Sequence, residues 1–454
     1  MKVTLMRNVV ALLRVAACAG RDLVKGLNRP TRAEIGTTWA TAFGRCAVLL
    51  VVIAAVAGGA FAQKRIRDLK PTVILISLDG FRYDYIDKFN TPTLKQLART
   101  GVRAEWMIPS FPTKTFPNHY TIATGLYPEH HGIVDNNVWD FGSTFTIGDR
   151  TKVQDARWWL GEPIWVTAQE QGQIAASYFF VGSEAPVKGV HPKYWTTYNG
   201  KVPPQMRVDK VLSWLDLPVK ERPTMITMYF SDTDDAGHEF GPDAEETRYA
   251  ALNDDDYIAR LVKGLARRGI ADKVNIIVVS DHGMAAVDVR KVAFIDDYID
   301  VAKDTNRILY THEINQIFPK EGKLDYVYSQ LKKMPFATCW KKGEIPERLH
   351  YNDGARIAPI VCSTEIGHIV TTHPRYDAYI KTIPDPERPR GGHGHDNRYQ
   401  EMQAVFVAHG PAFKRGYVAK PFSNVEVYNV MCKILGLKPA PNDGDLRHVK
   451  GMLR

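Results

Sequence analysis

Short runs of consecutive hydrophobic residues alternate along the chain with stretches whose hydrophobic residues follow a helical period. Three runs are rich in β-branched residues, which is typical of strands buried on both faces of a parallel sheet. They cover residues 72–78, 224–230 and 274–280, and a run at 404–408 predicts a fourth strand. The periodic stretches predict helices at 92–100, 118–124, 245–268 and 425–435. Because strands and helices alternate, we predict an α/β fold: a doubly wound, mostly parallel sheet with helices on both faces.

The same pattern divides the chain into five segments. A basic N-terminal segment precedes an uncharged apolar run, and a short linker then leads into a long α/β domain followed by a tail. These segments are residues 1–45, 46–62, 63–70, 71–443 and 444–454. Within the long domain, the stretch from about Lys303 to Lys381 is less regular, and we expect a small insert or cap there.

The apolar run at 46–62 has 17 residues, which is the lower limit for a membrane-spanning helix. It ends in Ala60-Phe61-Ala62, a pattern that fits cleavage of a signal peptide. A cleaved signal peptide, an uncleaved membrane anchor and a true start later than Met1 are all open, and each would export the rest of the chain. We therefore expect a periplasmic, secreted or membrane-anchored protein with its main domain outside the cytoplasm.

The formal net charge of +9 belongs to the N-terminal part. Residues 1–70 hold 12 basic and 3 acidic residues, whereas the remainder holds 47 of each. Binding of nucleic acid needs a basic face on the domain concerned. The charge therefore gives no support to nucleic-acid binding by the main domain.

Five cysteines are present, and none forms a Cys-x-x-Cys pair, which argues against a zinc ribbon. In an oxidising compartment, Cys339 and Cys362 can close a loop and leave Cys432 buried on the C-terminal helix. Spacing alone does not decide this pairing. The disulfide therefore stays one of two open possibilities.

An acidic residue follows each of the three buried strands. The first strand ends at Asp79 and the third at Asp281-His282, while the second runs into the segment that carries Asp234 and His238. Ligands of open α/β sheets bind beyond the carboxyl ends of the strands, so we expect these side chains to meet at one edge. A Gly-rich loop at 391–397 adds two more histidines. Asp and His ligands without Cys suit zinc, and their number allows two ions.

The stretch 109–131 places the hydroxyl of Thr115 directly before Phe116-Pro117. Proline is favoured in the first turn of a helix, so Thr115 is expected at or just before the start of a helix that Gly125 ends. Free N–H groups and the helix dipole favour negative charge there, including a bound phosphate. Thr115 is thus a candidate nucleophile; the alternative is that it only caps the helix.

These motifs, in this order, resemble the nucleotide pyrophosphatase/phosphodiesterase family of the alkaline phosphatase superfamily. The resemblance extends from about Pro71 to Asp443 and rests on the blocks ILISLDGFRYDY, FPTKTFPNHYTIATGLYPEHHGIVDN, GEPIWVTA, DTDDAGHEFGP, VVSDHGM, GGHGHDN and GLKPAPNDG. It implies an alkaline-phosphatase-like fold with two Zn2+ ions. The implied ligands are Asp234, His238 and His393 for one ion, and Asp79, Asp281, His282 and Thr115 for the other.

The resemblance also implies roles beside the ions. Thr115 would act as the nucleophile, and Asn136 would hold a phosphate oxygen. Phe116 and Tyr198 would hold a nucleobase between their rings.

Two positions depart from the family's usual motifs. Asp235 adds a second acid beside Asp234, where the family often has serine, and its role is open. His395 stands where the family often has tyrosine. We favour His393 over His395 as the ligand, because His393 directly follows the glycine pair 391–392.

The resemblance implies an exported, zinc-dependent phosphodiesterase/pyrophosphatase that cleaves nucleotides and nucleotide diesters to nucleoside monophosphates through a covalent phosphothreonine. One alternative is a choline-phosphate or lysophospholipid phosphodiesterase of the same fold, since aromatic rings also bind quaternary ammonium groups. Another is an inactive surface-interaction module, which the intact ligand set disfavours. The apolar Phe116 after the nucleophile favours a diester over a monoester. The expected partners are a nucleotide or phosphodiester substrate and, if the anchor is uncleaved, a membrane.

Overall fold

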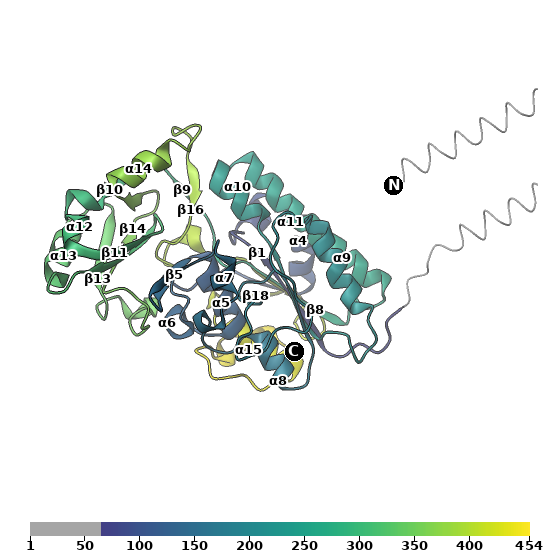
Figure 1. The fold of residues 1–454 in the computed structure, drawn as a ribbon. Coiled ribbons are helices and arrows are strands. Elements are labelled where there is room, and N and C mark those ends of the chain that lie inside the picture. Colours follow the sequence, from purple (N-terminus) through teal and green to yellow (C-terminus); the bar gives the residue numbers. More distant parts are fainter. Residues whose placement is uncertain (1–64) are drawn as a thin grey trace, which may run out of the picture. The chain divides into compact units, whose positions relative to one another are not determined.

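A seven-stranded sheet organises residues 65–454, the part of the chain that the structure, a computed structural model, describes (Figure 1). Its strand order is β18-β2-β17-β8-β1-β7-β6. The strands are β1 Thr72–Leu78, β2 Val102–Ala104, β6 Ala175–Tyr178, β7 Met225–Phe230, β8 Val274–Val279, β17 Phe406–His409 and β18 Tyr417–Ala419. The predicted α/β fold with a mostly parallel sheet is confirmed.

The direction of the strands is uniform except at β17. Strands β8, β1, β7 and β6 pair in parallel, and β18 pairs in parallel with β2. Strand β17 is antiparallel to both of its neighbours, β8 and β2. The fourth strand predicted at 404–408 therefore exists, but it begins at Phe406 and runs against the others.

Helices cover both faces of this sheet (Figure 1). On one face lie α4 Pro92–Thr100, α9 Pro204–Leu215 and α11 Glu245–Arg267; on the other lie α5 Thr115–Thr124, α8 Ile164–Glu170 and α15 Glu426–Leu435. Alternate residues of β1 point into the two layers, with Val73 and Leu75 in one core and Ile74 and Ile76 in the other. This explains why the strand reads as a continuous apolar run: both of its faces are buried.

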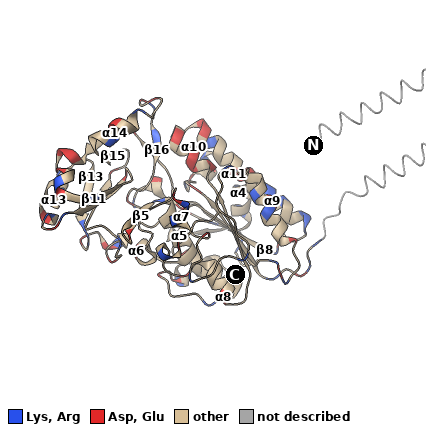
Figure 2. Ribbon diagram, in the orientation of Figure 1, with Lys and Arg blue, Asp and Glu red and all other residues tan. Residues whose placement is uncertain are grey.

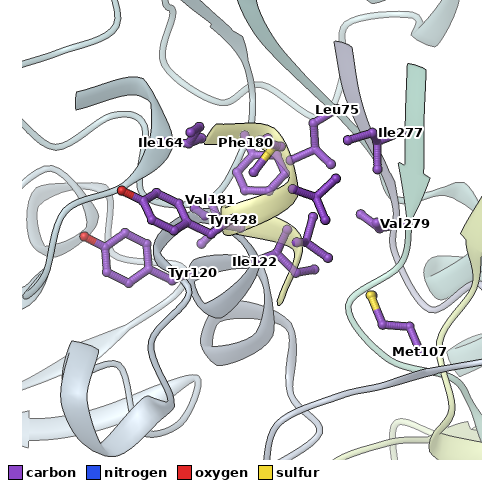
Figure 3. Close-up of a cluster of buried hydrophobic side chains, with 14 of the residues drawn as sticks. Leu75, Met107, Tyr120, Ile122, Ile164, Phe180, Val181, Ile277, Val279 and Tyr428 are labelled. Atoms are coloured by element: carbon purple, nitrogen blue, oxygen red, sulfur yellow. The ribbon is translucent and has the colours of Figure 1, made fainter. Parts of the chain in front are cut away.

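Figure 3 shows the first of these cores, in which side chains of the sheet face those of three helices. Leu75, Ile277 and Val279 come from the sheet, and the residues that meet them include Ile122 of α5, Ile164 of α8 and Tyr428 of α15. Full burial of one such aliphatic side chain contributes roughly 1.5–3 kcal/mol. The packing holds β1 and α5 in fixed relative positions, and these two elements carry Asp79 and Thr115.

Shorter elements connect these layers. The helices among them are α3 Tyr85–Lys88, α6 Pro128–His131, α7 Arg150–Val153, α10 Asp232–Phe240 and α16 Leu446–Val449. Small two-stranded pairs are β3 Met107–Ile108 with β19 Phe422–Ser423, β4 Asn137–Asp140 with β5 Ser143–Thr146, β9 Ala285–Val287 with β16 Arg390–Gly392, and β10 Val292–Phe294 with β15 Ile369–Thr371.

The stretch expected as an insert or cap contains a second, antiparallel sheet with its own small core, called the insert sheet below. Its order is β11-β12-β14-β13, formed by Thr305–Tyr310, Ile314–Pro319, Ile360–Thr364 and Ala337–Lys341. Along the chain, α12 Val301–Asp304 precedes this sheet, α13 Leu324–Leu331 lies between β12 and β13, and α14 His373–Ile380 follows it. Cys339 on β13 and Cys362 on β14 are directly opposite each other and form a disulfide, and Cys432 is free and buried on α15.

The two ends of the chain differ in what the structure describes. The basic segment 1–45 and the apolar run 46–62 lie outside the described residues, so the signal-peptide and anchor readings stay predictions. Among residues 65–454, no helix has the length and apolar character needed to cross a membrane. The segment 444–454, set apart as a tail, contributes Val449 and Met452 to the first core.

Candidate metal centre and active site

Thr115 is the first residue of α5, as its place before Pro117 predicts. The residue at the N-cap is Lys114, and no side chain caps this helix, so Thr115 is not the capping residue. Gly125 ends the helix in the left-handed region, with φ +70°, which glycine adopts without strain. The Thr115 hydroxyl is partly exposed and lies 3.3 Å from Nε2 of His282. It therefore faces the cluster of acids and histidines predicted from the strand ends.

The ends of β1 and β8 bring three of these residues together. The two strands pair in parallel, so Asp79 and Asp281 emerge side by side. His282 Nε2 lies 2.9 Å from Oδ2 of Asp281 and 3.5 Å from Oδ1 of Asp79. All three side chains are buried. The parallel register of two neighbouring strands thus explains why residues about two hundred positions apart converge.

A second group forms where α10 meets the Gly-rich loop. The segment after β7 folds into α10, which places Asp234 and His238 one turn apart. His238 Nε2 lies 3.4 Å from Oδ2 of Asp234, and His393 Nε2 lies 3.7 Å from Oδ1 of Asp234. Figure 2 shows the acidic character of α10.

Backbone carbonyls fix which nitrogen of each histidine faces the cluster. Nδ1 of His238 donates to Gly391 O, and Nδ1 of His393 donates to Thr113 O, both at 2.9 Å. In the neutral rings the Nε2 atoms then carry lone pairs, and these two atoms face each other at 3.0 Å. Two lone pairs at that distance repel unless a cation lies near both. Ligand histidines in metal sites are held by their other nitrogen in this manner.

Buried carboxylate oxygens without hydrogen-bond partners are a second feature that suits the binding of a cation. Among the described residues, Asp79 Oδ1 and Asp234 Oδ1 are buried and accept no hydrogen bond. Leaving such groups unsatisfied is costly. Asp234, His238 and His393 form one group that could hold a metal ion; Asp79, Asp234 and His282 form another, and Asp79, His119 and Asp281 a third. The residues present therefore fit divalent metal binding by oxygen and nitrogen.

The pKa values of the cluster describe an environment that attracts positive charge. Burial, followed by the charges of Asp281 and Asp234, raises the pKa of Asp79 well above its usual range. Burial alone would also raise the pKa of Asp281, but His282 and His119 hold it well below its usual value. Burial lowers the pKa of His282, and the charge of Asp281 more than reverses this. The carboxylates are thus stabilised as anions only where a cation accompanies them.

His395 does not belong to the metal-binding group. Its Nδ1 lies 3.0 Å from the Thr364 hydroxyl, and the ring is buried. The structure brings His393, and not His395, to Asp234 and His238.

Two residues near the cluster, Tyr229 and His119, support it through hydrogen bonds. Tyr229 donates its hydroxyl to Oδ2 of Asp79 at 2.6 Å. His119 donates from Nδ1 to the carbonyl of Thr115, and its Nε2 lies 2.8 Å from the Ser77 hydroxyl. The only signals in the sequence were a polar hydroxyl near the end of a buried strand and the four-residue spacing between Thr115 and His119.

A cavity of about 420 Å³, called the aromatic pocket below, opens beside Thr115. The rings of Phe116 and Tyr198 both line it, as does Asp235. The ring centres of Phe116 and Trp159 lie 6.1 Å apart, so Trp159 packs against Phe116. The two residues predicted to hold a nucleobase therefore border the same cavity as the candidate nucleophile.

Asn136 lies between the aromatic pocket and a second cavity beside the metal-binding residues. Its Oδ1 accepts a hydrogen bond from the backbone N–H of Phe116 at 3.0 Å, next to Thr115. It also lines a second cavity, of about 490 Å³, together with His238 and His393. We call this second cavity the insert-side pocket, because its far wall comes from the insert sheet and α14.

Comparison with known proteins adds to this geometry. Residues 73–396 match the family model described as type I phosphodiesterase/nucleotide pyrophosphatase. The chain is 38% identical over 391 residues to a venom phosphodiesterase of Macrovipera lebetinus, covering 82% of this chain and 44% of the relative. It is 37% identical to the rat ectonucleotide pyrophosphatase/phosphodiesterase family member 3, covering 85% of this chain and 44% of that protein. The chain thus spans less than half the length of these relatives.

Solved structures give a match over the full length of the neighbour. Murine ectonucleotide pyrophosphatase/phosphodiesterase 5 is similar with a TM-score of 0.77 and 33% identity, covering 84% of this chain and 100% of that one. A second structure of that mouse protein, an inactive threonine-to-alanine variant in complex with AMP, has the same TM-score at 32% identity.

Proposed function

The chain belongs to the type I phosphodiesterase/nucleotide pyrophosphatase family, and on this premise we propose that it hydrolyses nucleotides and nucleotide diesters to nucleoside monophosphates. The observation that supports this most is the Thr115 hydroxyl, which stands partly exposed at a helix N-terminus and 3.3 Å from His282. An AMP complex of the mouse relative supports the same class of substrate.

We propose two zinc ions at this centre. Asp234, His238 and His393 are the residues that would hold one ion; Asp79, Asp281 and His282 would hold the other, beside Thr115. Bound there, the ions would supply a positive charge that neutralises a phosphate group and lowers the pKa of a hydroxyl or water. The unpartnered carboxylate oxygens and the facing histidine nitrogens support this assignment.

In the proposed reaction, Thr115 is the nucleophile. Its hydroxyl loses its proton to water, and Oγ1 forms a bond to phosphorus. The bond between phosphorus and the leaving oxygen breaks, and the electron pair stays with that oxygen. Water then attacks the phosphothreonine, breaks its bond from phosphorus to Oγ1, and returns the threonine hydroxyl together with a nucleoside monophosphate.

Neighbouring groups of the chain position the substrate. The start of α5 is the positive end of a helix dipole, which would stabilise negative charge as it develops on the phosphate. The side chain of Asn136 accepts the Phe116 N–H through Oδ1, so its Nδ2 is the donor left for a phosphate oxygen. The nucleobase lies in the aromatic pocket between Phe116 and Tyr198.

We also propose that the domain works outside the cytoplasm. The disulfide between Cys339 and Cys362 supports an oxidising compartment. The venom enzyme and the ectonucleotide enzyme among the relatives support the same location.

The test is hydrolysis of the nitrophenyl ester of thymidine monophosphate by the purified, zinc-loaded protein and two variants. Thr115→Ala is expected to lose more than about a thousandfold in kcat, because it lacks the nucleophile, while it keeps its zinc content and circular dichroism spectrum. Thr115→Ser, which retains a hydroxyl, is expected to keep measurable turnover and to yield a phosphoserine after rapid acid quench. Turnover by Thr115→Ala at the wild-type rate overturns the assignment.

A second substrate distinguishes the proposed nucleotide activity from the alternative, a choline-phosphate phosphodiesterase. Nitrophenyl phosphorylcholine has the same leaving group but lacks the nucleoside. We expect the nucleotide ester to be preferred, because two rings flank a pocket large enough for a base. A preference for the choline ester at equal concentrations identifies the lipid-type activity instead.

A further inference from the structure

We propose that the insert-side pocket binds the leaving group of the substrate, and that Arg375 and Arg390 make it select leaving groups that carry phosphate, such as pyrophosphate or a second nucleotide. The inference rests on the proposed function, because it concerns the other half of the same substrate. It names two residues outside the metal centre and outside the aromatic pocket.

The position of this pocket matches the path of a departing group. One of its walls consists of His238, His393 and Asn136, so it opens directly onto the metal cluster. The aromatic pocket meets the cluster at Thr115 and Asp79, and Ile147 lines both pockets. Displacement at phosphorus is in line, so the leaving group departs on the side away from the nucleophile. With the base in the aromatic pocket, the insert-side pocket is the space left for that group.

The charge of the pocket is positive and not neutralised. Arg375, on α14, and Arg390, at the start of β16, both line it. Among residues 65–454, neither guanidinium forms a hydrogen bond or an ion pair with a carboxylate. A guanidinium with free donors in a concave site is suited to bind phosphate oxygens in pairs.

Neighbouring basic residues are already paired, which makes these two distinctive. Lys114 also lines the pocket, but its Nζ lies 2.6 Å from Oε2 of Glu313 and is neutralised there. Arg388, two residues before Arg390, pairs with Glu246 at 3.2 Å. The free positive charge is thus confined to the two arginines that face the cavity.

A purely structural role does not account for Arg375. Its guanidinium lies 4.4 Å from the centre of the Tyr310 ring, which holds the side chain over the pocket. However, α14 has no buried residue, so the helix does not need Arg375 to anchor it in a core. Stacking on tyrosine leaves the edge of a guanidinium free to donate hydrogen bonds. The arrangement orients a cation toward the cavity without neutralising it.

The experiment compares two substrates that transfer the same group and differ in what leaves. Thymidine triphosphate loses pyrophosphate when the bond from the α-phosphorus to the bridging oxygen breaks, whereas the nitrophenyl ester of thymidine monophosphate loses nitrophenol. For Arg375→Gln and for Arg390→Gln, kcat/KM for the triphosphate is expected to fall about tenfold or more, the usual effect of losing a charged hydrogen bond. For the nitrophenyl ester it is expected to change less than about threefold.

Arg388→Gln is the matched control, because it removes the same side chain two residues away and outside the pocket. We expect it to keep the wild-type ratio of the two rates. Inorganic pyrophosphate, added as an inhibitor of ester hydrolysis, is expected to bind more weakly to the two pocket variants by a similar factor. If the wild type hydrolyses the ester but the pocket variants keep the wild-type ratio and pyrophosphate inhibition, this inference fails alone. If the wild type hydrolyses neither substrate, the proposed function fails as well.

Discussion

The central sheet and the insert sheet are built on opposite plans, and the difference explains where the chemistry lies. In the central sheet, four adjacent strands run in parallel and have both faces covered, so their carboxyl ends meet at one edge. Asp79 and Asp281 emerge there side by side. In the insert sheet every neighbour is antiparallel, so strand ends are divided between two edges and no such cluster arises. The insert supplies a wall and charges to a site that the central sheet creates.

Buried polar contacts join the two regions just beside the nucleophile. The ion pair between Lys114 and Glu313 connects the residue before Thr115 to the turn before β12. Asp135 accepts a hydrogen bond from Thr311 of the insert at 3.2 Å, next to Asn136. The comparison therefore predicts that changes at the sheet edge abolish chemistry, that changes in the insert affect mainly its own stability, and that changes at this junction respond to pH.

The largest effect is expected at the edge of the central sheet. Asp79→Asn removes a proposed metal ligand, and kcat/KM for the nitrophenyl ester is expected to fall more than about a hundredfold, since even indirect partners of metal ligands are worth that much. In the metal-free protein, by contrast, the same substitution is expected to stabilise the fold. Burial and the charges of Asp281 and Asp234 raise the pKa of Asp79, so neutralising it relieves repulsion. The variant is expected to unfold at higher urea concentration than wild type when a chelator is present.

Two controls separate the contributions to this result. Chelator alone is expected to abolish wild-type activity, and added zinc to restore it. Asp377→Asn, on the exposed helix α14, is expected to change neither activity nor the urea midpoint. A metal-free Asp79→Asn protein that is less stable than metal-free wild type contradicts the picture of crowded, unpartnered carboxylates.

The same contrast between the two sheets explains which parts of the molecule could be predicted from the sequence. The continuous apolar runs identified the three central parallel strands, and the acids after them were correctly expected at one edge. The direction of β17 could not be predicted, because a strand buried on both faces has the same composition in either orientation. The helix at Asp232–Phe240 was not predicted, because its three aspartates are weak helix formers.

The supports of the site were harder to foresee than its ligands. Tyr229 acts through a tertiary contact with Asp79, and a hydroxyl within a strand carries no signal of its partner. His119 contacts the Thr115 carbonyl one turn away in its own helix, so only its spacing from Thr115 was visible in the sequence. Arg375 and Arg390 come from α14 and β16, on either side of an irregular connection, so no spacing in the sequence relates them. Local pattern therefore predicts the edge of the central sheet, whereas the far wall of the insert-side pocket depends on how the insert packs against that sheet.

A smaller effect is expected from opening the disulfide of the insert sheet. The bond between Cys339 and Cys362 closes a loop with a sequence separation of 23. Replacing both residues by alanine is expected to lower the free energy of unfolding by about 3–4 kcal/mol on the loop-entropy scale, measured by urea denaturation. Hydrolysis of the nitrophenyl ester is expected to stay within about twofold of wild type, because neither cysteine borders the metal cluster. Loss of that activity in a folded double variant contradicts the division of labour between the two sheets.

The smallest effect is expected at the junction, where burial raises the pKa of Asp135 to about 6. A carboxyl with a raised pKa in the folded protein stabilises the fold fully below its unfolded pKa, and that contribution is lost as the pH rises through about 6. In Asp135→Asn the neutral amide does not titrate. Between pH 4 and pH 8, the unfolding free energy of the variant minus that of wild type is therefore expected to shift by about 2–3 kcal/mol in favour of the variant.

The measurement compares the difference between variant and wild type at two pH values. A change in unfolding free energy that does not depend on pH, such as the loss of hydrogen bonds to Thr311 and Asn136, therefore cancels. The same comparison also removes the opposite contribution of His131, whose pKa burial lowers to about 3 and whose charging destabilises wild type and variant alike as the pH falls. A difference that stays constant from pH 4 to pH 8 shows that Asp135 is ionised throughout. Both acids of the junction, Asp135 and Glu313, are then charged, and the single positive charge of Lys114 stabilises both carboxylates.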